Sequence, residues 1–205
     1  IDDIKFNNIA IHHLSMLKGS EMETEEERIE HSLETKFRVN LEQEIIRLKK
    51  TTIAILGTQK TIESNIYFNS IKKHRKNIQI YNIACPLFVP IVEEGLENTP
   101  ISLSIIKYYL NKIRNKKIEQ AILGCTHYPI LFKDLNLFFN HNIDILHSGP
   151  IVSKKIKKYF SNKKKTKQSI NYYVTDLPQY FQKHGNRFLN GTINNVKKIT
   201  ISKDI

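Results

Sequence analysis

The chain has 205 residues, 40% of them hydrophobic, which is enough apolar material for one sizeable domain or two small ones. Its formal charge is +12, and no apolar run approaches the length of a membrane span. The two cysteines, neither of them in a CxxC pair, argue against a secreted disulfide scaffold and against a zinc site, and they favour a reducing cytoplasm.

Residues 1–48 differ in character from the rest. The first residues are polar and mixed in charge, which argues against a signal peptide, and an initial Ile in place of Met indicates a fragment, a processed chain or an incomplete gene. An acidic run at 21–27 and apolar residues at helical spacing predict a helical segment, in which we find no chemical motif.

From residue 49 onward, apolar strand patterns alternate with helical ones. The predicted strands are 52–56, 78–83, 120–123, 143–146, 171–175 and 196–201, and the predicted helices are 58–73, 101–115, 129–139, 152–160 and 177–189, with a lysine-rich loop at 162–168. This alternation predicts an α/β fold with a mostly parallel sheet flanked by helices. In such sheets chemistry is expected at the carboxyl ends of the strands.

Three loops at those ends carry the candidate residues, and the strongest candidate is Cys125. It follows a strand and Gly124, in a loop that leads into a helix, where exposed backbone N–H groups favour the thiolate. His127, two residues later, is placed to pair with a thiolate or to pass a proton. The alternative is a buried structural cysteine beside a histidine that only caps a helix.

Cys85 has apolar neighbours, so a core cysteine is the preferred interpretation, although a two-thiol site with Cys125 stays open on the residues alone. Glu93 and Glu94 follow the same apolar stretch. A carboxylate there is placed to orient His127, and a solvated glutamate at a helix start is the equal alternative. Thr58 and Thr61 begin a hydroxyl-rich helix that is suited to a carboxylate or a phosphate.

Two basic clusters, at 72–76 and within 154–167, favour contact with phosphate or nucleic acid. They lack interleaved aromatic residues and match no binding module. A general excess of Lys, Asn and Ile, typical of AT-rich genomes, is the preferred explanation, so nucleic acid is disfavoured as a partner.

Three ordered motifs resemble the second half of bacterial glutamate racemases. They are Ile-Leu-Gly-Thr-Gln-Lys-Thr at 55–61, Ala-Cys-Pro-Leu-Phe-Val-Pro-Ile-Val-Glu-Glu-Gly at 84–95 and Leu-Gly-Cys-Thr-His-Tyr-Pro at 123–129. Tyr-Val-Thr-Asp at 173–176 is similar to the closing segment of the same family. The resemblance covers residues 49–205, which we expect to form a racemase-like α/β domain with the aspartate/glutamate racemase fold.

The resemblance implies an isomerase that interconverts L- and D-glutamate for peptidoglycan synthesis, without cofactor or metal. In that family two cysteines face opposite sides of the substrate α-carbon. Cys125 matches the second of them, His127 a residue that assists the thiol, and Glu93 a carboxylate that supports the histidine. Thr126 matches a substrate-binding residue, and Thr58 and Thr61 match pocket hydroxyls. Cys85 matches a cysteine that is not a catalytic base.

The family's first half, which carries the other catalytic cysteine in an Ala-Cys-Asn-Thr context, has no counterpart here. The family spacing leads back to the region of 12–14, which holds His-His-Leu. We therefore expect an incomplete or diverged racemase that acts on glutamate, with a homodimer as an option and no membrane partner. The alternatives are a catalytically inactive remnant or binding protein, and a racemase for another acidic amino acid such as aspartate.

Overall fold

The computed structural model of the chain describes residues 50–151, 153–154 and 171–200. The expected N-terminal helical segment and the lysine-rich loop lie outside these ranges, as does most of the helix expected at 152–160. Helical structure is present earlier than that prediction, at residues 148–151, and continues at 153–154.

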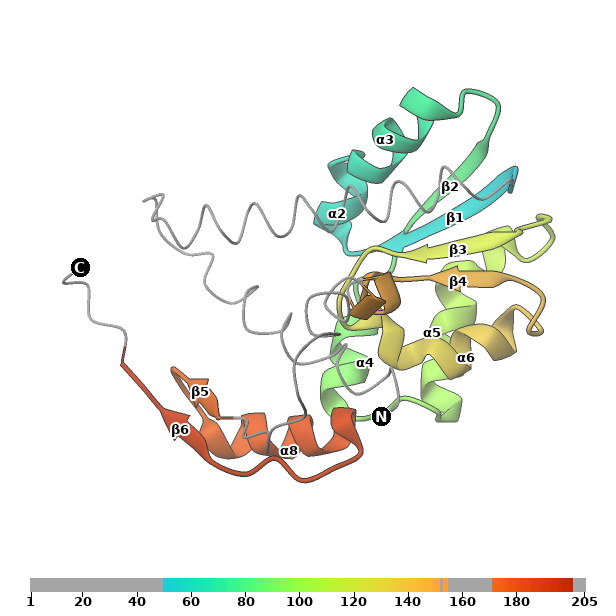
Figure 1. Cartoon of the computed structure of the whole chain (residues 1–205). Helices are drawn as coiled ribbons and strands as arrows, with labels where there is room; N and C mark the ends of the chain where they lie inside the picture. Colours follow the sequence, from blue (N-terminus) through green and yellow to red (C-terminus); the bar gives the residue numbers. More distant parts are fainter. Residues whose placement is uncertain (1–49, 152, 155–170, 201–205) are drawn as a thin grey trace.

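The main sheet has four parallel strands in the order β2-β1-β3-β4 (Figure 1). The strands are β1 (Thr52–Gly57), β2 (Gln79–Ala84), β3 (Gln120–Leu123) and β4 (Asp144–Leu146). All three pairings are parallel, which confirms the predicted mostly parallel sheet. β1 and β3 occupy the two central positions and are buried along almost their whole length, so their sequences are continuous apolar runs.

Helices cover both faces of this sheet (Figure 1). One face carries α2 (Gln59–Glu63) and α3 (Ile66–His74), and the other carries α4 (Phe88–Glu94), α5 (Pro100–Leu110) and α6 (Phe132–Phe138). A hydrophobic core lies on each face of the sheet, and alternate residues of β1 point into one or the other. Ile53 and Ile55 lie in the core on the α3 side, and Ala54 and Leu56 lie in the core on the other side. Within the described ranges, no helix is long and apolar enough to cross a bilayer.

The helix expected over 58–73 is two helices. Asn65 adopts a left-handed conformation with φ 52°, and this residue ends α2 and turns the chain into α3. Asparagine tolerates that conformation better than most residues. The helix expected over 129–139 likewise begins as a 3-10 turn at Tyr128–Leu131 before α6, and the one expected over 101–115 ends at Leu110 in a second 3-10 turn.

Helix α4 was not among the predicted elements. Pro90 lies inside its sequence and argues against a helix there, yet it occupies the first turn, where backbone N–H groups have no intrahelical acceptor to lose. Glu93 and Glu94 consequently lie in the last turn of a helix and not at a helix start, which corrects the alternative interpretation of these residues.

The C-terminal part forms its own small parallel sheet of β5 (Tyr172–Val174) and β6 (Val196–Lys198), joined by α8 (Pro178–Leu189). The strand, helix and strand expected here are all present, with shorter strands. Phe188 of α8 packs against the core beneath the main sheet, so this unit is attached to the α4 side of the molecule (Figure 1).

Candidate active site

Three loops that leave the carboxyl ends of neighbouring strands are joined by hydrogen bonds. The Gly124 N–H donates to the Leu56 carbonyl at 2.8 Å, and the Cys85 N–H donates to the Gly57 carbonyl at 2.9 Å. The Tyr128 hydroxyl donates to the Cys85 carbonyl at 2.8 Å. The predicted convergence of these loops is therefore present, and it fixes the backbone on both sides of Cys125.

Cys125 lies half-buried at the start of its loop. Burial raises the pKa of the thiol, while the backbone N–H groups of His127, Tyr128 and Thr126 act in the opposite direction. The N–H groups expected from the sequence are thus in place, but desolvation outweighs them because the sulfur lies largely out of water. The resting group is accordingly a thiol that needs a base or a bound cation to ionise at neutral pH.

His127 connects this thiol to a carboxylate. Its Nδ1 lies 4.0 Å from the Cys125 sulfur, and its Nε2 lies 3.5 Å from Oε1 of Glu93. The imidazole is 10% exposed and the glutamate side chain 39% exposed, so solvent reaches the series from the glutamate end. A carboxylate beside Nε2 favours the tautomer with its proton on that nitrogen. The Nδ1 lone pair then faces the thiol and is placed to accept its proton.

Thr58 and Thr61 lie on the β1 side of the same loop. Their hydroxyl oxygens are 2.9 Å apart, and Thr58 caps α2 by accepting from the Thr61 N–H at 3.3 Å. Thr126, between Cys125 and His127 in the sequence, is half-buried, and its backbone N–H is directed at the sulfur. These hydroxyls border the site, and their expected roles in substrate binding stay predictions.

Gly124 allows this close approach of the two loops. A Cβ at this position would lie 3.1 Å from the Tyr67 ring and 3.2 Å from the Thr61 methyl group, with the Leu56 carbonyl at 3.4 Å. A side chain here would force the Tyr67 ring and the Thr61 methyl group to shift by a few tenths of an ångström. The glycine therefore lets the loop that bears Cys125 lie close to the start of α2.

Cys85 is a core residue, as its apolar neighbours indicate. Its side chain is fully buried, and burial raises the pKa of its thiol to about 12. Within the described residues, the thiol makes one weak hydrogen bond, to the Ile83 carbonyl at 3.7 Å. A thiol in this state takes no part in proton transfer, so the two-thiol pairing of Cys85 with Cys125 is not supported.

Two residues near the site were not identified from the sequence. Tyr128 belongs to the recognised motif, but only the fold shows that its hydroxyl reaches Cys85. His147 follows β4, the strand beside β3; its Nδ1 is buried, and no hydrogen-bond partner for it lies in the described part of the chain. Burial lowers the pKa of this imidazole. A histidine at a predicted strand end was the available signal.

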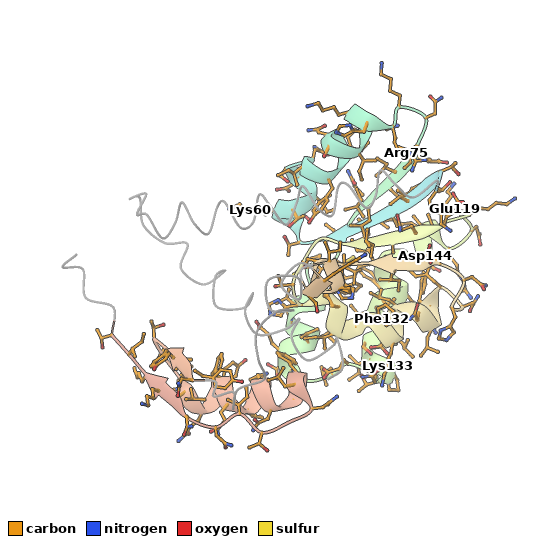
Figure 2. The ribbon with its side chains drawn as sticks, in the orientation of Figure 1. Lys60, Arg75, Glu119, Phe132, Lys133 and Asp144 are labelled. Carbon is orange, nitrogen blue, oxygen red and sulfur yellow. The ribbon has the colours of Figure 1, made fainter. Side chains whose placement is uncertain are left out.

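The opposite, amino edge of the sheet has different chemistry. Glu119 and Asp144 lie there, far from Lys60 at the start of α2 (Figure 2). A cavity of about 270 Å³ opens at that edge, between residues 113–118 and 138–143, and contains no residue of the three motifs. Over residues 50–151, 153–154 and 171–200, no group of three or more His, Cys, Asp or Glu side chains is placed to hold a metal ion.

Similarity to known proteins agrees with the motifs. No family model matches the sequence. A glutamate racemase from Chlorobaculum parvum is 37% identical over 141 residues, which are 66% of this chain and 52% of that protein. One from Thermoanaerobacter is 32% identical over 155 residues, covering 74% of this chain and 59% of the relative. The chain is homologous to the glutamate racemases.

The fold supports the same relationship. The crystal structure of glutamate racemase from Francisella tularensis, in complex with D-glutamate, superposes with a TM-score of 0.69 at 27% identity, covering 80% of this chain and 62% of that one. The racemase from Campylobacter jejuni gives a TM-score of 0.64 at 27% identity, with 75% and 62% covered. The chain spans about half the length of the curated racemases it matches.

Proposed function

We propose that this chain carries one half of a cofactor-independent glutamate racemase site, in which Cys125 exchanges a proton at the substrate α-carbon. The observation that carries the proposal is the series Cys125–His127–Glu93, with spacings of 4.0 Å and 3.5 Å, at the carboxyl edge of a racemase-like sheet. Homology to glutamate racemases supports glutamate as the substrate.

In the proposed step, His127 accepts the thiol proton, and the resulting thiolate removes the α-proton to form an S–H bond. The electron pair of the broken C–H bond remains on the substrate as a carbanion delocalised into its carboxylate. A single base returns a solvent-derived proton to the same face, so the chain alone exchanges the α-hydrogen. Inversion requires a second acid on the opposite face, and within this sequence the only other thiol is the buried Cys85.

The test is solvent exchange at the α-carbon. L- and D-glutamate are incubated separately in D₂O with the full chain, and loss of the α-proton signal is followed by NMR. We expect exchange of one enantiomer, with a rate that rises as pH increases, because burial raises the pKa of the Cys125 thiol and only the thiolate removes the proton.

Cys125→Ser is expected to lower the exchange rate at least about 100-fold, the order that proton-transfer groups contribute. Cys85→Ala is the matched control, since this buried thiol is not placed in the site. Exchange that persists in Cys125→Ser would contradict the assignment. Aspartate, tested in parallel, decides between the two acidic amino acids.

A binding protein without turnover is the second candidate, and the single half-buried thiol favours it. This candidate predicts that calorimetry detects glutamate binding to wild-type protein while no α-proton exchange occurs in D₂O. Absence of both binding and exchange would leave a scaffold role.

The wider setting is also part of the proposal. Residues 49–205 act as the racemase-like α/β domain, and the D-glutamate that forms once a second acid completes the site serves peptidoglycan synthesis in the cytoplasm. A homodimer is the proposed assembly.

A further inference from the structure

Arg187, near the end of α8, connects the C-terminal unit to helix α4. Its Nε lies 3.3 Å from Oε1 of Glu97, and its Nη2 donates a hydrogen bond to the Val92 carbonyl. The side chains are only 30% and 14% exposed, so the pair is well shielded from solvent. A shielded guanidinium that donates to a carbonyl and forms an ion pair with a carboxylate holds the two groups in a fixed relative position.

The guanidinium acts as a cap on the carboxyl end of α4. The Val92 carbonyl belongs to the last turn and also accepts from the N–H of Gly95, which ends the helix in a left-handed conformation with φ 74°. A Cβ on Gly95 would collide with the Arg187 guanidinium. A cation at this end of a helix is favoured by the partial negative charge of the terminal carbonyls.

This last turn also carries the carboxylate of the candidate site. Glu93 follows Val92 directly, and its Oε1 lies 3.5 Å from Nε2 of His127. A turn that frays would move Glu93 away from the imidazole, because a seven-residue helix has few other hydrogen bonds to hold its end. Arg187 is therefore connected to the Cys125 thiol through the last turn of α4, Glu93 and His127.

We propose that Arg187 is a positioning residue of the proton-exchange site: by capping α4 it holds Glu93 against His127 and so sets the ionisation of Cys125. This role presupposes the proposed proton exchange at Cys125. The experiment that tests it does not, since thiol ionisation is measurable without turnover.

A purely structural role is the alternative, in which Arg187 only attaches α8 to the core. The structure offers a way to separate the two, because Phe188, over whose ring the Arg187 guanidinium lies at 4.8 Å, itself packs against the same core. Loss of the guanidinium should therefore leave α8 attached. The structural alternative predicts a change in thermal stability alone, whereas positioning predicts a change at the thiol.

The experiment measures the rate of Cys125 alkylation by iodoacetamide as a function of pH, by mass spectrometry of the full chain. Cys85, fully buried, is not expected to react. In Arg187→Met we expect the profile to move to higher pH and the rate at pH 8 to fall about 3- to 10-fold, since a tenfold change corresponds to one pKa unit. Arg187→Lys should recover part of the loss, because an ammonium reaches either the Val92 carbonyl or the Glu97 carboxylate but not both.

Lys183→Met is the matched control, one turn earlier on α8 and exposed, and it should leave the profile unchanged. Adding Arg187→Met to Glu93→Gln should shift the profile no further than Glu93→Gln alone, if Arg187 acts through Glu93. Should Arg187→Met fail to fold, Glu97→Gln weakens the same contact and is expected to shift the profile in the same direction by less.

A profile for Arg187→Met, or for Glu97→Gln if the former does not fold, that superposes on wild type would overturn the positioning role, whatever happens to the melting temperature. A double variant that shifts beyond Glu93→Gln would also overturn it. The proposed function fails separately, if wild-type protein shows the expected alkylation behaviour but no α-proton exchange in D₂O.

Discussion

Tyr128 shows how a motif residue can support a site without taking part in its chemistry. Its ring is fully buried and meets Phe88 edge-on at 5.0 Å, and its hydroxyl donates to the Cys85 carbonyl at 2.8 Å. Burial raises the pKa of this phenol, so it remains a neutral donor. The bond joins the loop that bears Cys125 to the loop that follows β2.

Replacing Tyr128 with Phe should lower the free energy of unfolding by about 0.5–1.5 kcal/mol, the net value of one hydrogen bond. The cost stays in that range because the Cys85 carbonyl keeps a second donor, the Phe88 N–H at 3.0 Å. Urea denaturation measures it. Tyr108→Phe is the control, since this tyrosine is 77% exposed and should change stability little. Equal losses in both variants would contradict the role of the buried bond.

At the scale of residues, the sequence predicts neighbours along the chain better than neighbours in space. Cys125 and His127 are two residues apart, and their proximity was expected and is confirmed at 4.0 Å. The sequence predicted that backbone N–H groups would favour the thiolate, whereas burial raises the pKa of the Cys125 thiol. This burial was not expected because it depends on elements that are distant in the sequence. Arg187 was missed, since nothing local to its helix indicates that its partners, Val92 and Glu97, lie in α4 and just beyond it.

At the scale of elements, the division of one expected helix into α2 and α3 depends on a single residue. Asn65 has φ 52°, accepts from the Asn82 side chain at 3.4 Å and donates to the Glu63 carbonyl at 3.2 Å. A left-handed conformation costs residues with a Cβ roughly 1–2 kcal/mol, and glycine avoids this cost.

Asn65→Ala should therefore reduce the free energy of unfolding by about 1–2 kcal/mol. Asn65→Gly should cost less, because it loses only the two weak side-chain bonds. Asn69→Ala, at an exposed position inside α3, should be neutral or slightly stabilising, since alanine is the better helix former. Chemical denaturation compares the three variants. If glycine at position 65 proved as costly as alanine, the backbone explanation would be wrong.

The errors in these two helices, at 58–73 and at α4, have different physical causes. Periodicity reports which faces are buried, and a left-handed residue at a helix junction leaves that pattern nearly intact, as at Asn65. Pro90 produced the opposite error, because a proline usually ends a helix but is tolerated in the first turn. Buried strands such as β1 and β3 were predicted closely, since their apolar runs are short and bounded by Gly57 and Gly124.

At the scale of the whole molecule, stability should depend on pH through His147. Burial lowers its pKa in the folded chain, so the unfolded chain binds the proton more readily. Stability is then complete above the usual histidine pKa of about 6.5 and declines as pH falls from there toward the lower folded value. Hydrogen bonds lower the pKa values of Glu119 and Asp176, so protonation of these carboxylates reduces stability only at more acidic pH.

His147→Gln should flatten the dependence of unfolding free energy on pH between about 7 and 5, the interval in which the unfolded histidine takes up its proton. Denaturant titrations at several pH values measure the slope. His141→Gln is the control, at an exposed turn before β4. A slope unchanged by His147→Gln would show that other groups govern this range.

Most of the main sheet was predictable, whereas the pairing of β5 with β6 in a sheet of their own was not. Strand patterns identify which segments are extended, but not their partners, because pairing depends on contacts far apart in sequence. The site was predictable as far as motif and topology place residues at one edge. The burial of Cys125, and the contacts of Tyr128 and Arg187 that hold the site, depend on how the elements pack and were not predictable.

The position of β1 has a consequence for the way the chain folds. Ile53 pairs with Ile80 on one side and with Gln120 on the other, so the strand gains its second neighbour only after a long stretch of chain has been added. During synthesis, which proceeds at roughly 5–20 residues per second, one apolar edge of β1 stays open for several seconds. An extended, uncharged segment in that state is a template for intermolecular association and a natural binding site for chaperones. The same central strand that organises the site is thus the part of the nascent chain most exposed to misassembly.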